Sequence, residues 1–405
     1  MGYRRSAAGG TRRLIPVPLL AVLALLSATA PFATDMYLPV LPAIGGQFGA
    51  SPALVQLTLT GFFLGMGVGQ LLVGPLSDVW GRKRLLVVAA GVALVASVGA
   101  ATAPGILILI AARTLQGLGG GACVVLARAI VSDLATGNAA ARAYSLLMAI
   151  GALAPAIAPI IGGFLAEPIG WRGIYWALVG LHAVQLLLAV AVVPATGGHS
   201  AGGQRLAGQV AANYLAVART REFWGFAAAT AFGFGALFCY IAASPFVIQH
   251  SFGFSPRAYS FIFAANALGL VLAALTNSWA VNRVGAVAML RVGVAAQFLA
   301  AAVLLGAAAL NAPVPVQLLC LFFCVGPTGL ILGNSTALAT GLLRTRAGAA
   351  SALLGFVQSL AAGAVSPLVG LGHNPPVDMA AGMVACSLLA VAGAWAATAA
   401  IARRR

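Results

Sequence analysis

One carboxyl group stands inside a long apolar run near the start of the chain. Asp35 lies between Pro31 and Pro42, whereas the other five acidic residues fall near predicted helix ends or in loops: Asp78, Asp133, Glu167, Glu222 and Asp378. A carboxyl group in a poorly solvated cavity tends to keep its proton, and a nearby arginine opposes this. Asp35 is therefore a candidate for loading and releasing a proton. The alternative is that it only caps or gates the outer part of its helix.

A second ionisable group, Arg113, also lies within an apolar run. An arginine in such a place is costly and must find a partner. Gln116 follows one turn later, so both side chains are expected on one interior face. The functional interpretation is a charge that tunes Asp35 or binds a substrate, and the structural one is an arginine bonded to carbonyl groups. Arg128, nearer the end of the same run, is expected to snorkel.

The elements that hold these residues follow from composition. Apolar residues make up 61% of the 405 positions and charged residues only 7%, and mean hydropathy is +1.03. A soluble protein needs more charge to cover its surface. Because only helices and closed barrels satisfy the backbone in lipid, and the apolar runs show no alternation, an all-α membrane protein is predicted.

The pattern predicts twelve helices, each reaching about 20 residues, the length needed to cross the hydrocarbon core. Their expected ranges are 14–44, 53–77, 84–103, 105–133, 142–166, 172–194, 222–249, 257–280, 286–309, 313–341, 347–371 and 377–401. The predicted domains are a basic N-terminus (1–13), a six-helix bundle (14–194), a linker (195–221), a second six-helix bundle (222–401) and a basic tail (402–405).

The basic residues orient these helices. With twelve spans, 18 of the 22 Lys and Arg fall on one side of the membrane, and only Arg172 and Arg257 fall on the other. Positive residues gather in cytoplasmic loops. We therefore expect a multi-pass inner-membrane protein with both termini and the linker in the cytoplasm.

Several other classes of function are disfavoured. The net charge of +16 comes from clusters between apolar runs, which indicates topology rather than nucleic-acid binding. No nucleotide loop, Ser/His/Asp set or metal cluster is evident, so neither an enzyme nor a metal site is predicted. The five cysteines are expected to be small core residues, and the four histidines appear scattered at ends and loops: Cys123, Cys239, Cys320, Cys324, Cys386, His182, His199, His250 and His373.

A weak internal repeat joins the two predicted bundles. An offset of 204 residues aligns Gly81 with Gly285 and pairs Asp78 with Asn282. The same offset pairs Gly151 with Gly355. Two related halves are expected of secondary transporters, whose binding site lies between the halves near the middle of the membrane.

The loop between the second and third predicted helices reads Gly74-Pro-Leu-Ser-Asp-Val-Trp-Gly-Arg-Lys-Arg84. Gly81 permits a sharp turn, and Arg82 is placed to reach a carboxylate at the end of another helix, with Asp133 as the candidate. Together with Asp78, such a pair would latch one conformation. The alternative is a set of solvated charges that only sets topology.

The fifth predicted helix combines prolines with small residues. Pro155 and Pro159 remove backbone donors and bend the helix, and Gly162 and Gly163 allow tight packing. The alternative is a kinked helix with a purely structural role.

These motifs resemble those of a known family. The string Gly74-x-Leu76-x-Asp78-x-x-Gly81-Arg82-Lys83 resembles the loop signature of the major facilitator superfamily, apart from Val79, where a basic residue is usual. Residues 113–119 resemble its arginine motif, and residues 151–163 are similar to its antiporter motif. Thr34-Asp-Met-Tyr-Leu-Pro39 resembles the bicyclomycin and chloramphenicol resistance (Bcr/CflA) branch of drug exporters.

The resemblance implies a secondary transporter that exports small amphipathic drugs or toxic metabolites in exchange for protons by alternating access. It implies a small-molecule substrate, protons and a lipid bilayer as partners, a monomer, and no cofactor beyond the proton gradient. Some relatives carry a second acid about two turns before Asp35, and the region around Ser27 has none. The alternatives are a proton symporter that imports a metabolite, and a channel or transport-dead sensor.

Substrate contacts are expected in a cavity between the halves. An aromatic residue in a membrane helix more often packs against neighbours, so each candidate competes with that alternative. The candidates are Phe32, Tyr37, Phe62, Gln116, Phe238, Tyr240, Asn266, Phe356 and Gln358.

Overall fold

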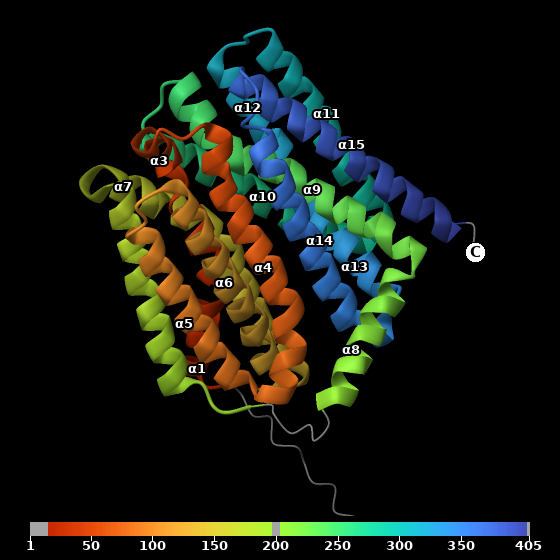
Figure 1. Ribbon diagram of the computed structural model, residues 1–405. Coiled ribbons are helices and arrows are strands. Elements are labelled where there is room, and N and C mark those ends of the chain that lie inside the picture. Colours follow the sequence, from red (N-terminus) through yellow and green to blue (C-terminus); the bar gives the residue numbers. More distant parts are fainter. Residues whose placement is uncertain (1–14, 197–202, 403–405) are drawn as a thin grey trace, which may run out of the picture.

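A computed structural model describes residues 15–196 and 203–402. The predicted basic N-terminus at 1–13 and residues 403–405 of the predicted tail lie outside the described residues. Within these two stretches every regular element is a helix, and helices alone form the bundle (Figure 1). The predicted all-α membrane fold is confirmed.

The first half of the chain forms one broken helix and four more segments. Its elements are α1 (Val17–Ser27), α2 (Thr29–Asp35), η1 (Leu38–Val40), α3 (Leu41–Phe48), α4 (Pro52–Trp80), α5 (Arg82–Ala101), α6 (Ile106–Leu134) and α7 (Gly137–Val192). The first four run together as one apolar stretch from Val17 to Phe48, long enough to cross a membrane.

Helix α7 is two spans in one. Its apolar part, Arg142–Val192, has 51 residues, or about 77 Å at 1.5 Å per residue, more than twice the hydrocarbon thickness of about 30 Å. The helix breaks at Gly170, which has φ 63° and ψ −174°, a conformation that suits glycine. Because each of the other ten apolar stretches is long enough to cross once, the described residues have the length for the twelve predicted spans.

The second half begins with a helix that the sequence did not predict. Helix α8 (Gly203–Ala218) occupies much of the predicted linker at 195–221. It is followed by α9 (Arg221–Phe246), the π-turn η2 (Val247–Ser251), α10 (Pro256–Val284), α11 (Ala286–Ala309), α12 (Val314–Val325), α13 (Thr328–Gly341), η3 (Arg344–Arg346), α14 (Ala347–Leu368) and α15 (Pro375–Ala402). The predicted helix at 313–341 is therefore interrupted at Gly326 and Pro327, where the proline lacks a backbone donor.

The predicted repeat is visible in the helix ends. Helices α4 and α10 each have 29 residues. The hydroxyl of Ser51 accepts from the Leu54 amide at 3.3 Å, and that of Ser255 accepts from the Ala258 amide at 3.2 Å, so both helices carry the same N-cap. Both end at a glycine with positive φ, 88° at Gly81 and 86° at Gly285.

Small residues bring helices of the first half into close contact. A Cβ on Gly65 of α4 would lie 2.0 Å from the Thr114 carbonyl oxygen of α6, and one on Gly117 would lie 1.9 Å from the Phe62 carbonyl oxygen. The backbones of α4 and α6 therefore touch, as small residues permit in membrane helices. This contact fixes the register of α6 and, with it, the position of Arg113.

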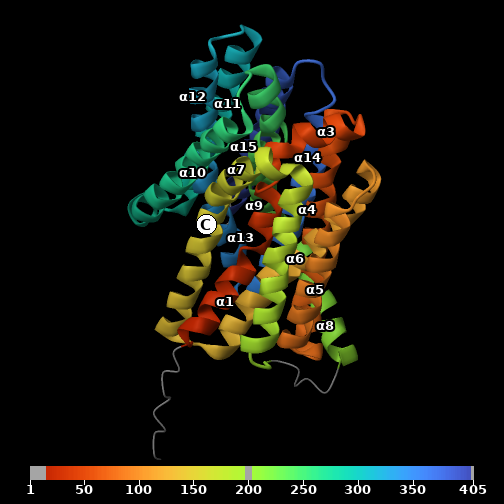
Figure 2. The same cartoon turned by 90° about the vertical axis from the view of Figure 1, so that its left-hand side faces the viewer.

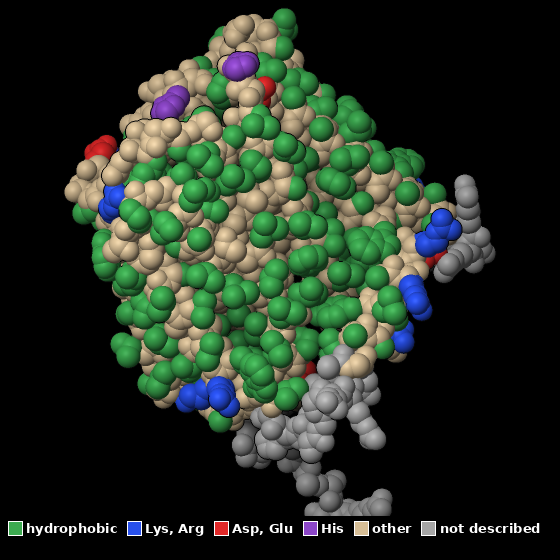
Figure 3. All heavy atoms as spheres, viewed as in Figure 1, with side chains coloured by type: hydrophobic (Ala, Val, Ile, Leu, Met, Phe, Trp, Pro, Cys, Tyr) green, Lys and Arg blue, Asp and Glu red, His purple; other side chains and the backbone are tan. Residues whose placement is uncertain are grey.

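The two halves meet along α4 with α14 and along α7 with α10. We call the end of the bundle with the turn at 80–82 and α8 the linker end, and the end with the turn at 48–52 the opposite end; both are visible in Figure 2. Hydrophobic side chains are spread over the whole face seen in Figure 3, and most of its Lys and Arg side chains lie toward the linker end and α8. This distribution matches a bundle that crosses a membrane.

Candidate functional site

A central cavity of about 520 Å³ lies between the two halves. This volume is within the range of about 300–1,000 Å³ typical of small-molecule sites. Its walls come from both halves and are mostly apolar, with an aromatic group formed by Phe63, Phe234, Phe238, Tyr240 and Phe263. The arrangement can hold an amphipathic small molecule.

Asp35 is the one acidic residue of the described chain that lines this cavity. It is the last residue of α2, and only 6% of its surface is exposed. The described residues form three ion pairs, Arg82–Asp78, Arg82–Asp133 and Arg257–Glu167, and Asp35 belongs to none of them. Asp35 therefore lines the cavity without an ion-pair partner among the described residues.

Arg113 lies beside this region but is sealed from the cavity. Its side chain is fully buried, and its guanidinium carbon stands 4.2 Å from the centre of the Tyr37 ring and 4.5 Å from that of Phe62. One terminal nitrogen donates to the Ala33 carbonyl oxygen at 2.7 Å and also to the side chain of Gln116. Arg113 is therefore tied to the backbone two residues before Asp35.

The packing around Arg113 shows that three of the predicted cavity residues lie elsewhere. Tyr37, Phe62 and Gln116 are fully buried around Arg113 and do not line the central cavity. The amide of Gln116 donates to the Ser97 hydroxyl at 2.7 Å, which directs it toward α5. These side chains turn inward because a buried guanidinium is stabilised by ring faces and acceptors.

The other predicted cavity residues divide into two groups. Phe238, Tyr240 and Gln358 line the cavity, whereas Phe32, Asn266 and Phe356 do not. Asn266 stands behind the wall, where its amide donates to the Tyr240 hydroxyl at 3.0 Å. The sequence did not single out Phe63, Phe234 or Phe263, because spacing within an apolar run does not tell which face meets a gap between halves.

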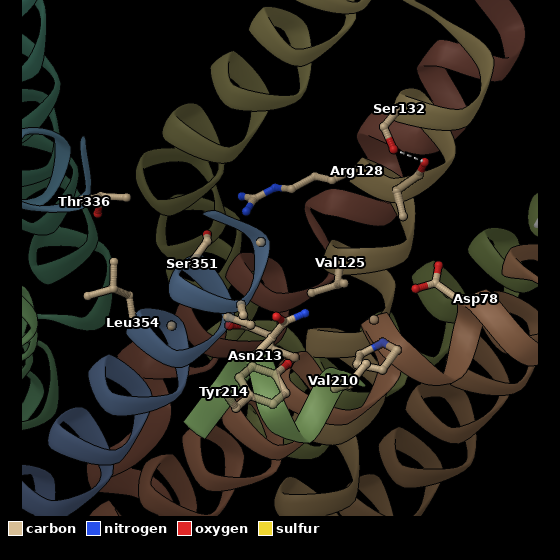
Figure 4. A pocket seen from close by; sticks show the side chains of 18 of the residues that line it. Asp78, Val125, Arg128, Ser132, Val210, Asn213, Tyr214, Thr336, Ser351 and Leu354 are labelled. Carbon is tan, nitrogen blue, oxygen red and sulfur yellow. Dashed lines mark hydrogen bonds between the residues drawn. The ribbon is translucent and has the colours of Figure 1, made fainter. Parts of the chain in front are cut away.

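A wider space adjoins the central cavity at the linker end. It has a volume of about 780 Å³ and is bordered by α8, and we call it the vestibule (Figure 4). The two spaces share the lining residues Met66, Gln70, Arg128 and Gln358. The central cavity is therefore approached from the linker end.

Hydrogen bonds between the halves close the opposite end. The amide of Gln56 donates to the Ala242 carbonyl at 2.9 Å, and that of Gln249 donates to the Pro39 carbonyl at 3.0 Å. Arg257 of α10 pairs with Glu167 of α7 at 2.8 Å. The structure is thus closed at one end and hollowed at the other.

The structure brings the predicted latch residues together within the first half. Arg82 pairs with Asp78 at 2.6 Å and with Asp133 of α6 at 3.1 Å. The same guanidinium also donates to the side chain of Ser77. These contacts hold the start of α5 against the ends of α4 and α6.

The predicted antiporter motif of α7 meets both the cavity and the other half. Gly151 and Pro155 line the central cavity. A Cβ on Gly162 would lie 1.8 Å from the Met36 carbonyl oxygen, next to Asp35, and one on Gly163 would lie 2.2 Å from Ser260 Oγ of α10. The two glycines therefore allow α7 to touch the end of α2 and the second half. Pro159 lies along α7 between the cavity-lining pair, Gly151 and Pro155, and these two glycines.

A buried polar network was missed because His182 was expected near a helix end. His182 instead lies inside α7, with 1% of its surface exposed. Its Nδ1 lies 2.9 Å from the side-chain oxygen of Gln185, which also accepts from the Thr29 hydroxyl at 3.1 Å. The Gln185 amide donates to the Leu25 carbonyl at 2.8 Å. The network braces the break between α1 and α2.

With this geometry, a helical bundle in two related halves around a central cavity defines a membrane transporter. The family model of the Major Facilitator Superfamily matches residues 23–367, and the chain belongs to that superfamily. It is 35% identical over 386 residues to the uncharacterized MFS-type transporter YdgK of Bacillus subtilis, covering 94% of each chain. It is 32% identical over 376 residues to a bicyclomycin resistance protein homolog of Haemophilus influenzae, covering 92% of this chain and 94% of the relative.

A third relative is the chloramphenicol resistance protein of Pseudomonas aeruginosa, 32% identical over 305 residues, which cover 75% of this chain and 69% of the relative. The predicted resemblance to the bicyclomycin and chloramphenicol resistance branch is thus confirmed.

Solved structures share the fold at low identity. A D-xylose–proton symporter superposes with a TM-score of 0.71 at 17% identity, covering 92% of this chain and 96% of its own. A bacterial homolog of the lysosomal transporter Spinster, in an inward-facing and unoccupied conformation, gives 0.72 at 16% identity, with 96% and 98% covered.

Proposed function

We propose that this protein exports small amphipathic molecules in exchange for protons, with Asp35 as the coupling carboxylate. The observation that carries the proposal is the position of Asp35. It is the acidic residue in the wall of a largely apolar cavity that lies between the halves and is reached from one end. Relatives named for resistance to bicyclomycin and chloramphenicol support export of drugs.

Exchange requires that substrate and proton oppose each other. A substrate enters through the vestibule while Asp35 carries a proton and displaces that proton from the cavity. The halves then rock about their contacts, the opposite end opens, and the substrate leaves. A proton from the other side reloads Asp35 and permits return. Because one carboxyl group serves both ligands, the proton gradient sets the direction of transport.

The proposal includes an orientation. The linker end faces the cytoplasm of a bacterial inner membrane, since the basic residues predicted on the cytoplasmic side cluster near the termini, the turn at 80–82 and the linker. In this orientation the structure is open to the cytoplasm. A monomer suffices, because both halves of the cavity come from one chain.

The test is accumulation of chloramphenicol in everted membrane vesicles whose interior is acidified. The wild-type protein is expected to concentrate the drug when the gradient is present. Asp35→Asn cannot exchange a proton, so gradient-driven accumulation is expected to fall at least about 10-fold, while drug–drug counterflow continues. Asp378→Asn, which removes a carboxylate outside the cavity, is the matched control.

Undiminished gradient-driven accumulation by Asp35→Asn would remove Asp35 from the coupling role. Release of the substrate from the vesicles, together with the protons that leave their acidic interior, would favour a proton symporter that imports a metabolite.

A further inference from the structure

Arg128 stands where the central cavity joins the vestibule. It lines both spaces, and in Figure 4 its side chain extends from α6 into the gap, toward Thr336 and Ser351 of the second half. A snorkelling arginine would instead direct its charge along the helix to the membrane surface. The predicted snorkelling of Arg128 is therefore wrong. Its charge lies where the vestibule joins the central cavity.

This guanidinium has no acidic partner within the part of the chain that the structure describes. The ion pairs there use Arg82 and Arg257 as cations. Asp78 also borders the vestibule, but Arg82 binds it at 2.6 Å. No hydrogen bond of the Arg128 side chain occurs among the described residues, although its backbone carbonyl accepts from the Tyr144 hydroxyl at 3.0 Å. No described acidic residue compensates this positive charge.

The surroundings of Arg128 would complete a site for an oxyanion. Neutral polar side chains border the same space, among them Gln70, Ser351 and Gln358. Met66 of α4 borders both spaces, and the aromatic group lines the central cavity, which Arg128 also borders. An occupant of both regions would meet a cation at one end and an apolar wall along its body.

We propose that Arg128 binds the carboxylate of an amphipathic substrate whose apolar body fills the central cavity. The proposal rests on the proposed function, in that the cavity holds the transported molecule. A guanidinium matches a carboxylate with two parallel hydrogen bonds, and Arg128 is exposed beside the vestibule, where a substrate can reach it.

The position is compatible with proton exchange. Arg128 lies on the vestibule side of the cavity, and Asp35 lies in the wall of the central cavity only. A carboxylate held at Arg128 leaves the neutral remainder of the substrate facing Asp35. Substrate and proton therefore still oppose each other at Asp35.

The test compares two fluorescent probes that differ in one group, dansylglycine and its primary amide, dansylglycinamide. Binding is measured by fluorescence with the full chain in phosphatidylcholine nanodiscs, after subtraction of the signal from empty nanodiscs. The wild-type protein is expected to bind the acid at least about 10-fold more tightly than the amide. Arg128→Gln is expected to weaken the acid by about 10- to 100-fold and to leave the amide unchanged.

Two further variants separate charge at this site from charge in general. Arg128→Lys keeps the charge without the planar fork and is expected to retain part of the preference for the acid. Arg84→Gln removes an exposed cation that borders neither space, and is expected to bind both probes as the wild type does.

Equal affinity for acid and amide in the wild type, or binding of neither, overturns the proposal, as does equal weakening of both probes by Arg128→Gln. If Arg128→Gln does not fold, the ratio in the wild type and in Arg128→Lys decides. The assay needs no gradient, so it is independent of Asp35. If the wild type prefers the acid but proton exchange fails, only the proposed function is refuted. If proton exchange works but the acid is not preferred, only the carboxylate site is refuted.

Discussion

At the scale of single residues, Arg113 holds the backbone that carries Asp35. Its bond to the Ala33 carbonyl satisfies an acceptor close to the break in the first span. Two of its nitrogens, Nε and Nη2, have no hydrogen-bond partner, so the rings of Tyr37 and Phe62 supply much of its stabilisation. The residue is better described as a positioning group than as a substrate contact.

This role predicts a specific response to substitution. Arg113→Lys keeps the charge but loses the planar fork that reaches both Ala33 and Gln116. We expect its apparent melting temperature in detergent to fall by about 5 °C, with a loss of proton-driven accumulation. Arg291→Lys is the control for replacing an arginine by a lysine, because Arg291 bonds Thr398 away from the cavity. Wild-type stability and transport in Arg113→Lys would show that charge alone matters.

At the scale of elements, α7 is one of the helices along which the two halves meet, and it also lines the site. Its N-terminal part lines the cavity through Gly151 and Pro155, and its glycines at 162 and 163 touch α2 and α10. Proline bends a helix because it removes a backbone bond. Bend and close packing together place this helix against the residue after Asp35.

A methyl group added at this contact is predicted to be far more harmful than one added elsewhere on the same helix. In Gly162→Ala the new Cβ would meet the Met36 backbone, which cannot rotate away, whereas a Cβ on Gly180 would meet nothing within 4 Å. We expect Gly162→Ala to reduce both the yield of monodisperse protein and gradient-driven accumulation several-fold, and Gly180→Ala to change neither. The two variants are compared by fluorescence-detected size-exclusion chromatography and vesicle transport, and equal behaviour would contradict the packing argument.

Helix α8 is a second element with contacts to both halves. The Tyr214 hydroxyl donates to the Leu71 carbonyl of α4 at 3.1 Å, and Arg346 of η3 donates to the Asn213 side chain at 3.2 Å. Asn213 and Tyr214 also border the vestibule (Figure 4). The helix therefore borders the vestibule while contacting both halves.

At the scale of the whole molecule, the bonds that close the opposite end are few and easily exchanged. Most join a neutral side chain to a backbone carbonyl, as Thr60 does with Gly363 at 2.8 Å, and each contributes about 1 kcal/mol. The Glu167–Arg257 pair is about half exposed and contributes little. Such an interface suits two halves that rock between states.

The orientation of the bundle predicts which end of α5 is reachable from outside the cell. In a background without the five native cysteines, Thr102→Cys at the opposite end is expected to react with a membrane-impermeant maleimide in intact cells. Arg84→Cys at the other end of α5 is expected to react only after permeabilisation. Both positions are exposed. The inverse pattern would place the linker outside and reverse the proposed direction of entry.

The sequence by itself determined the class of fold and the approximate extents of its membrane-spanning helices. Apolar runs long enough to cross a membrane predicted the twelve spans, because a lipid solvent leaves the backbone few alternatives. The offset of 204 residues predicted the two halves, and the paired serine caps and glycines at 81 and 285 show it in the backbone. Asp35 was identifiable because a carboxylate is rare inside an apolar run.

Only the tertiary structure decided which side chains face the cavity. Within an apolar run, a helix meets neighbouring helices, lipid and cavity with similar residues, so Tyr37 and Phe62 are indistinguishable in sequence from Phe63 and Phe238. Contacts with Arg113 hold the first pair around the guanidinium, whereas the second pair lines the cavity between the halves. The same reason applies to Arg128, because its chemistry depends on which space its charge enters.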